Sequence, residues 1–277
     1  MSVESGVISH YSAYDVLAKI KDGLVRMGVD PDHVEPGVLA PVDEFHIGGA
    51  EATAALLDRL DVRPGMEVLD IGCGIGGPAR AMARRSGAHV TGIDLTPDFV
   101  ETARELSRIS GMGDAVAYEV ASATDLPFVD GRFDLATMLH VGMNIPDKDA
   151  LFSEAARVLR AGGTFAVYDV MRTGSGELTF PVPWAESDAV SALAEPKAYR
   201  SAARASGLRL AHEEDRREVA LAFFERIQAA ASGSAPAPLG LHLLMGPTVR
   251  DKTANMMAAI RAGTIAPVQM IFRKNDS

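Results

Sequence analysis

Apolar positions along the chain change their spacing near residue 66, and this change divides the sequence into two regions. Residues 14–27 carry apolar side chains at helical spacing, and a second helical pattern runs over residues 51–60. The segment 30–43 between them contains three prolines and is predicted to be a connector. We therefore expect a helical cap over residues 1–49, ahead of a larger domain over residues 50–277.

From residue 66 onward, short apolar runs alternate with helical patterns. The expected strands are residues 66–71, 89–93, 116–120, 133–139 and 164–170, and the expected helices are residues 78–85, 98–110 and 147–159. Strict alternation of strand and helix predicts right-handed crossovers and a parallel sheet. Because helices cover both faces of such a sheet, its strands are expected to be apolar without a break, as residues 165–168 are.

The regular alternation ends after Val170. Residues 171–196 form a long irregular stretch, and such stretches inside a compact domain are usually functional lids or disordered. The later elements are predicted to be helices at 197–206, 217–231 and 248–262 and strands at 208–212 and 265–272, with a flexible connector at 231–238. The expected fold class is therefore α/β: a Rossmann-like, seven-stranded, mostly parallel sheet with helices on both faces, an N-terminal helical cap, and substrate-lid segments near residues 171–196 and 216–246.

Composition narrows the range of functions. The chain has 277 residues, of which 47% are apolar and 23% charged, and its formal net charge is -10. Because no run of lysine and arginine is present, nucleic acid and anionic membrane surfaces are poor candidates for partners. The single cysteine, Cys73, excludes an internal disulfide and a multi-cysteine metal site, and no clustered carboxylates suggest a catalytic metal. No secretory signal or membrane span is visible, so a cytoplasmic protein is expected.

A glycine-rich sequence joins the first predicted strand to the first crossover helix. Residues 68–78 read VLDIGCGIGGP, in which Gly72, Gly74 and Gly77 match the pattern G-x-G-x-x-G. Glycines allow a sharp turn and a close approach of the backbone to a ligand, and ligands of open α/β sheets bind at this carboxyl edge of the strands. The pattern alone fits a dinucleotide site as well as a nucleoside site.

Two carboxylates favour the nucleoside. Asp70 ends the first strand, where it would repel a pyrophosphate but would favour the cationic methionine portion of S-adenosylmethionine. Asp94 ends the second strand, at a distance past the glycines that suits a carboxylate accepting both ribose hydroxyls.

Four separate motifs follow one another in the order of a known family. They are LDIGCGIGG at residues 69–77, GIDLT at 92–96, DLPF at 125–128 and RVLRAGG at 157–163. Together they resemble class I S-adenosylmethionine-dependent methyltransferases, in particular the small-molecule branch that includes sarcosine/dimethylglycine and ubiquinone-type methyltransferases. The resemblance implies the family's fold, S-adenosyl-L-methionine as cofactor and S-adenosyl-L-homocysteine as product.

The resemblance also implies roles for individual residues. The cofactor-binding residues would be Asp70, Gly72, Cys73, Gly74 and Gly76 around the methionine portion, Asp94 at the ribose, Leu95 on the adenine face, Ser122 and Ala123 at the adenine edge, and Leu139. Many relatives have Gly-Asp-Ala where residues 121–123 here read ASA, so a neutral serine would replace the acidic partner of the adenine amino group. Segments around Tyr11 and His46 resemble parts that close over the cofactor in relatives. Their alternative roles are ordinary packing for Tyr11 and a simple helix entry around His46.

His140 follows the fourth predicted strand and is the candidate catalytic residue. Methyl transfer is an in-line displacement on a sulfonium, for which a protein mainly supplies alignment and a dry site. If the acceptor is an ammonium or a hydroxyl, a base must remove its proton, and an imidazole that titrates at about pH 6.5 suits that task. The alternative interpretation is that His140 only hydrogen-bonds the loop or the cofactor carboxylate.

The motifs constrain the substrate side less. We expect Met143, Asn144, Trp184 and His242 to contribute to the substrate pocket. The alternatives are that Trp184 anchors its irregular loop and that His242 is an ordinary core histidine.

The leading hypothesis is an enzyme that methylates a small amine, hydroxyl or activated carbon acceptor. The alternatives are a nicotinamide-dependent oxidoreductase and a non-catalytic nucleoside-binding protein. The fourth strand ends in LHVG at residues 139–142 and lacks the Asn/Asp-Pro-Pro-aromatic signature of base-modifying methyltransferases, and the lone cysteine disfavours arsenite methylation. The motifs specify neither the acceptor nor the oligomeric state.

Overall fold

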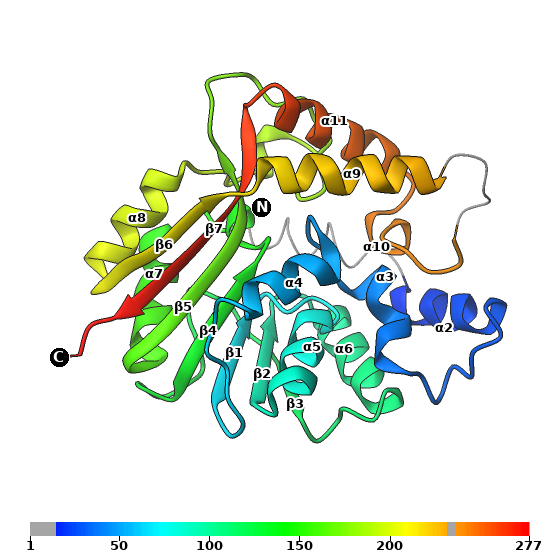
Figure 1. The fold of residues 1–277 in the computed structure, drawn as a ribbon, viewed down its shortest axis with the longest axis horizontal. Helices are drawn as coiled ribbons and strands as arrows, with labels where there is room; N and C mark the ends of the chain where they lie inside the picture. Colours follow the sequence, from blue (N-terminus) through cyan, green and yellow to red (C-terminus); the bar gives the residue numbers. More distant parts are fainter. Residues whose placement is uncertain (1–14, 232–236, 277) are drawn as a thin grey trace.

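The computed structural model describes residues 15–231 and 237–276, and a twisted seven-stranded sheet forms its centre (Figure 1). The strand order is β3-β2-β1-β4-β5-β7-β6, and β7 alone runs antiparallel to its neighbours. The strands are β1 (Glu67–Ile71), β2 (His89–Asp94), β3 (Val116–Val120), β4 (Phe133–Leu139), β5 (Leu159–Arg172), β6 (Leu208–Asp215) and β7 (Ile265–Lys274). The predicted Rossmann-like, mostly parallel sheet is confirmed.

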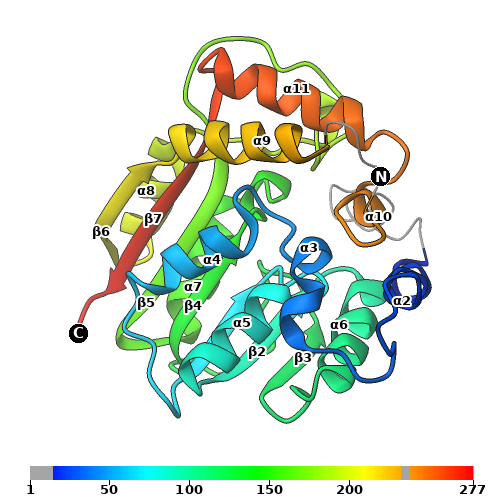
Figure 2. The same ribbon diagram turned by 45° about the vertical axis from the view of Figure 1, so that its right-hand side comes forward.

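Helices cover both faces of this sheet. Helices α4, α5 and α6 lie on one face, and α7 and α8 lie on the other (Figures 1 and 2). Their bounds are α4 (Gly49–Leu57), α5 (Gly77–Ser86), α6 (Pro97–Ile109), α7 (Lys148–Val158) and α8 (Pro196–Ala205). Helix α5 follows β1 and helix α7 follows β4, so the helices after these two neighbouring strands leave the carboxyl edge of the sheet toward opposite faces.

The unbroken apolar run in β5 follows from this layering. Phe165 and Val167 enter the core beneath α7 and α8, whereas Ala166 and Tyr168 enter the core on the opposite face. Successive side chains of a strand point to opposite faces, so a strand covered on both sides needs apolar residues at every position. The sequence pattern and the packing thus agree in the centre of the sheet.

The ends of the sheet differ from the prediction. β5 starts five residues earlier than expected, at Leu159, and β6 continues to Asp215 beyond the predicted end at His212. β6 is an edge strand with alternating exposure, and it pairs with the long strand β7 on one side only. Backbone pairing with β7 extends β6 through a polar sequence that contains no apolar signal for a strand.

The N-terminal region is more helical than predicted. Besides α2 (Val16–Arg26), the segment expected to be a connector contains η1 (Pro36–Leu39) and α3 (Ala40–Asp43). Pro36 and Pro41 stand at the first turns of these short helices, where a missing N–H removes no helical hydrogen bond. Ile20 and Leu24 of α2 share a core with Leu106 of α6, so this region packs directly against a helix that covers the sheet. Its description as a separate cap stays a prediction.

A further layer lies over the carboxyl edge of the sheet. Helices α9 (Arg217–Ala231) and α11 (Val249–Arg261) lie side by side there, and the short α10 (His242–Met245) lies near α2 (Figures 1 and 2). The long segment after β5 contains only the short η3 (Asp188–Val190), and η2 (Gly142–Asn144) follows β4. Within residues 15–231 and 237–276, no helix has the length and apolar character needed to cross a bilayer.

Candidate active site

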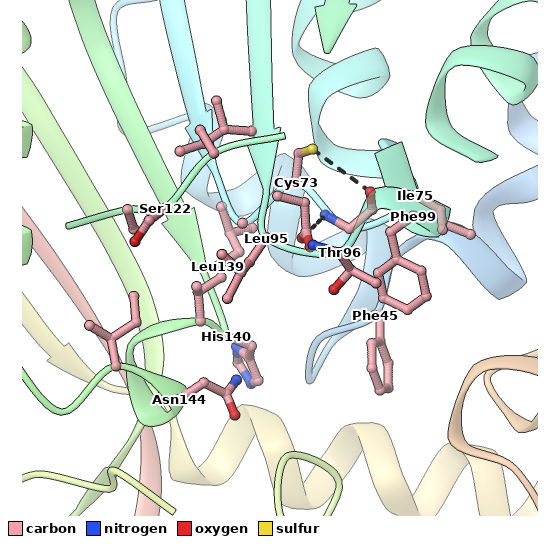
Figure 3. Close-up of a pocket in the computed structure, with 18 of the residues that line it drawn as sticks. Phe45, Cys73, Ile75, Leu95, Thr96, Phe99, Ser122, Leu139, His140 and Asn144 are labelled. Carbon is pink, nitrogen blue, oxygen red and sulfur yellow. Dashed lines mark hydrogen bonds between the residues drawn. The ribbon is translucent and has the colours of Figure 1, made fainter. Parts of the chain in front are cut away.

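A cavity of about 410 Å³ lies at the carboxyl edge of the sheet (Figure 3). Its walls come from the segments that follow β1, β2, β3 and β4, together with residues 43–46 and Leu244 of α10. Its volume falls within the range of small-molecule sites. Because α5 after β1 and α7 after β4 pack on opposite faces, this crevice lies where the strand order reverses, as expected for a ligand site of such a sheet.

Most residues singled out from the sequence meet in this cavity. Those that line it are His46, Gly72, Cys73, Gly74, Asp94, Leu95, Ser122, Ala123, Leu139, His140 and Asn144. Asp70, Gly76, Met143, Trp184 and His242 are outside its lining, and Tyr11 lies outside the described residues. The structure thus gathers the residues from five separate segments, but their roles stay predictions.

Further lining residues were not identified from the sequence. They are chiefly Phe45, Ile75, Thr96, Phe99, Thr124 and Leu244. Ile75 and Thr96 lie inside the recognised motifs, and Phe45 and Leu244 lie in segments expected to close the pocket. The only sequence feature that could have indicated Phe99 is its position in the first turn of α6, because this helix begins at the cavity.

The glycine loop after β1 and the end of β2 are joined through Asp94. One carboxylate oxygen accepts a hydrogen bond from the amide of Gly74 at 3.0 Å, and the other accepts one from the amide of Thr96 at 2.9 Å. Gly72 and Gly74 have φ values of +70° and +54°, a region that favours glycine, and a side chain at position 72 would collide with Val141. The loop therefore exposes backbone to the cavity, and Asp94 is fixed beside it with lone pairs left for a ligand.

Asp70 lies beneath the loop and not in the cavity wall. Thr137, its partner in the β1–β4 register, donates a hydrogen bond to Oδ1 at 2.7 Å, and no described residue donates to Oδ2. Burial raises the pKa of Asp70 to about 7. An unpaired acceptor directly below the loop fits a cationic ligand above it, the role predicted for Asp70 from the sequence.

His140 is held at both ring nitrogens. Its Nδ1 lies 3.1 Å from the carbonyl oxygen of Tyr168, and its Nε2 accepts a hydrogen bond from the amide of Ile47 at 3.3 Å. Because a carbonyl only accepts and an amide N–H only donates, the ring carries its hydrogen on Nδ1. Its backbone has a φ of +57°, the one positive value among the non-glycine residues described. These contacts favour a holding role over that of a free base.

The neutral state of His140 can be measured directly. Burial lowers its pKa to about 3, and burial also lowers the pKa of the neighbouring His46 to about 4. As the pH falls through about 6.5, each of the two rings takes up a proton in the unfolded chain, but both rings stay neutral in the folded protein. The contribution of the two histidines to the free energy of unfolding is therefore present above about pH 6.5 and is lost as the pH falls below it. The imidazole NMR signals of His46 and His140 should therefore not titrate between about pH 8 and pH 5 in the folded protein, and should titrate normally in concentrated urea. Protonation of either ring in the folded protein above about pH 5.5 would contradict this assignment.

The segment that contains His46 is fixed against the sheet at several points. Asp43 forms a buried ion pair of 2.7 Å with Arg80 of α5, and Thr53 donates to Glu44 at 2.7 Å. The hydroxyl of Tyr168 donates to the carbonyl of Ile47 at 3.1 Å. A side chain at Gly77 would lie 2.0 Å from the carbonyl of Asp43, so this close approach requires a glycine there. Residues 43–47 therefore form a docked wall of the cavity.

A buried lysine and a buried aspartate hold the segment after β4. The ammonium of Lys148 donates to three backbone carbonyls, those of Gly142 (2.9 Å), Ile145 (2.5 Å) and Ala192 (3.1 Å). Asp169 of β5 is fully buried and accepts a hydrogen bond from Tyr199 at 2.7 Å, and backbone amides at 141 and 142 also lower its pKa against the larger effect of burial. The cavity residues 141–145 are thus fixed from both sides.

Replacing Lys148 with methionine should therefore loosen this wall. Three carbonyls lose their donor, so we expect the free energy of unfolding to fall by roughly 1–3 kcal/mol and the affinity for a ligand of the cavity to fall with it. Urea unfolding and calorimetric titration measure the two effects. Lys197→Met, at an exposed position in the first turn of α8, is the matched control. If the two variants were equally stable, the lysine would not hold the segment.

Three predicted substrate residues belong to other surroundings. Trp184 and Met143 are buried in the core beneath α9 and α11, and the indole of Trp184 donates to Ser191 at 3.1 Å. The structure thus favours the alternative role of Trp184 as the anchor of its loop. In α10, Leu244 and not His242 reaches the cavity.

Comparison with known proteins agrees with the geometry. Residues 69–167 match a family model described as a methyltransferase domain. The chain therefore contains a segment that is similar to a methyltransferase domain. This segment holds the glycine loop, Asp94, Ser122 and His140, whereas the remaining cavity walls come from segments outside it.

Named methyltransferases are similar to this chain in sequence and in fold. Methyltransferase GfsG of Streptomyces halstedii is 38% identical over 151 residues, which are 54% of this chain and 52% of the relative. The chain therefore spans about half the length of this curated relative. Among solved structures, geranyl diphosphate C-methyltransferase of Streptomyces coelicolor A3(2) has a TM-score of 0.70 at 20% identity, with 99% of this chain and 98% of that chain covered. A Galdieria sulphuraria protein described as a sarcosine dimethylglycine methyltransferase has a TM-score of 0.66 at 21% identity, with 82% and 85% covered. These structures share the fold.

Proposed function

We propose that the protein transfers a methyl group from S-adenosyl-L-methionine to a small-molecule acceptor, with the cytoplasm as its expected location. The observation that carries the proposal is the pairing of the glycine loop with Asp94 at the cavity, inside a segment that matches a methyltransferase domain. Gly72 and Gly74 would hold the methionine portion, Asp94 would accept from the ribose hydroxyls, and Leu95 and Ser122 would meet the adenine. The nicotinamide and non-catalytic alternatives have no comparable support.

Methyl transfer requires little acid–base catalysis by the protein. The bond between sulfur and the methyl carbon breaks with its electron pair left on sulfur, and the acceptor's lone pair forms the new bond to that carbon. Where the acceptor atom carries a hydrogen, one proton leaves for solvent. The residues of this chain would align the two partners and exclude water, because the docked segment 43–47 and the fixed segment 141–145 enclose the cavity.

Two measurements test the proposal. Calorimetric titration should show binding of S-adenosylhomocysteine and none of NAD. Incubation with methyl-labelled S-adenosylmethionine and a cell extract should then place the label in a small molecule, identified by mass spectrometry. Binding of NAD alone, or label only in protein or nucleic acid, would refute it.

A further inference from the structure

We propose that the methyl acceptor is an uncharged molecule with an apolar body, and not a phosphorylated or otherwise anionic compound. This inference rests on the proposed function, because it concerns the part of the cavity that the cofactor would leave free.

The free part of the cavity is apolar. Figure 3 places Ser122 at one end and Phe45, Ile75 and Phe99 at the other, with the glycine loop and Leu95 between them. Ile75, Phe99 and Leu244 belong to one apolar cluster, against which Phe45 also packs. Ser122, the expected partner of the adenine, lies away from this end. An apolar ligand portion is therefore the one that gains most by burial here.

The charges around the cavity are unfavourable for an anion. Asp43, Asp94 and Asp147 line it, and within the described part of the chain no lysine or arginine does. Arg80 lies close by, but its guanidinium is paired with Asp43 and also donates to the carbonyl of Ile75 and to Ser107. Residues 1–14 and 232–236, which the structure does not describe, contain neither lysine nor arginine in their sequence. A phosphate would lose its hydration here without a cation to replace it.

A cationic amine is disfavoured for a different reason. An ammonium nitrogen has no free lone pair, so it must lose a proton before it can attack the methyl carbon. Two imidazoles of the described residues line the cavity: the lone pair of His140 Nε2 already accepts from the amide of Ile47, and His46 donates through Nε2 to the carbonyl of Gly49. Burial also lowers the pKa of both rings, so neither is suited to take that proton at neutral pH.

Two probes with the same carbon skeleton, one uncharged and one anionic, test the effect of charge on binding. The full-length protein is first saturated with S-adenosylhomocysteine, and failure at this step would count against the proposed function itself. Geraniol and geranyl monophosphate are then titrated into the saturated protein. We expect geraniol to bind at least about tenfold more tightly. Equal affinities, tighter binding of the phosphate, or binding of neither probe would overturn the inference.

A charge added at the apolar end gives the matched variant. Phe45→Lys should favour geranyl monophosphate over geraniol, whereas Val25→Lys, at an exposed position of α2, should keep the wild-type preference. If Phe45→Lys kept the wild-type preference while still binding S-adenosylhomocysteine, the charge argument would be wrong.

Discussion

Replacing Asp94 with asparagine is expected to weaken the binding of S-adenosylhomocysteine by about 10- to 100-fold. The carboxylate holds the amides of Gly74 and Thr96 and would also accept from the ribose, and hydrogen bonds to a charged group contribute roughly 1.5–3 kcal/mol. The neutral amide keeps only one accepting oxygen. Calorimetric titration at constant salt measures the change.

The matched control is Asp98→Asn, because Asp98 stands exposed in the first turn of α6, four residues after Asp94. This variant should bind the nucleoside as the wild type does. Thermal unfolding of both variants shows whether the fold is intact. An Asp94→Asn protein that is folded and binds with unchanged affinity would remove the basis for the proposed cofactor site.

Replacing Arg80 with methionine is expected to lower the free energy of unfolding by about 3–5 kcal/mol. Arg80 is 3% exposed, and its ion pair with Asp43 joins α5 to the segment that walls the cavity. Breaking a buried pair leaves the other charge without compensation, and this cost exceeds that of losing the contact itself. Urea unfolding followed by circular dichroism measures the change.

The double variant isolates the pair from other effects of the arginine. In Arg80→Met with Asp43→Asn, the buried carboxylate of position 43 is no longer present to be left without its cation, so the combined loss should be clearly smaller than the sum of the two single losses. Arg84→Met, on the exposed side of the same helix, should change stability by less than about 0.5 kcal/mol. Additive losses in the double variant would show that Asp43 and Arg80 stabilise the fold independently.

These contacts mean that the cavity is formed before any ligand binds. The segment 43–47 is attached to α5 through Asp43, to α4 through Glu44 and to β5 through Ile47. The segment after β4 is attached through Lys148. Binding a ligand then does not require the free-energy cost of ordering these walls, which is the advantage of a preorganised site.

The sequence predicted the centre of the fold and the expected cofactor residues because both depend on local patterns. β1, β2 and β4 are short apolar runs buried on both sides, so their ends could be placed within a residue or two. Once the strand ends are known, parallel pairing alone brings the glycine loop, Asp94 and His140 to one edge. Distance along the chain does not matter for residues placed in this way.

The tertiary structure alone decided the substrate side. Nothing local distinguishes Leu244, which reaches the cavity, from His242, which does not, or shows that Trp184 faces the core under α9 and α11. The same holds for the buried pairs of Asp43 with Arg80 and of Lys148 with distant carbonyls. These positions depend on how separate segments pack over the sheet, and the free energy of that packing is shared among residues far apart in sequence. A periodic pattern reports which face of an element is buried, but it does not report which partner covers that face.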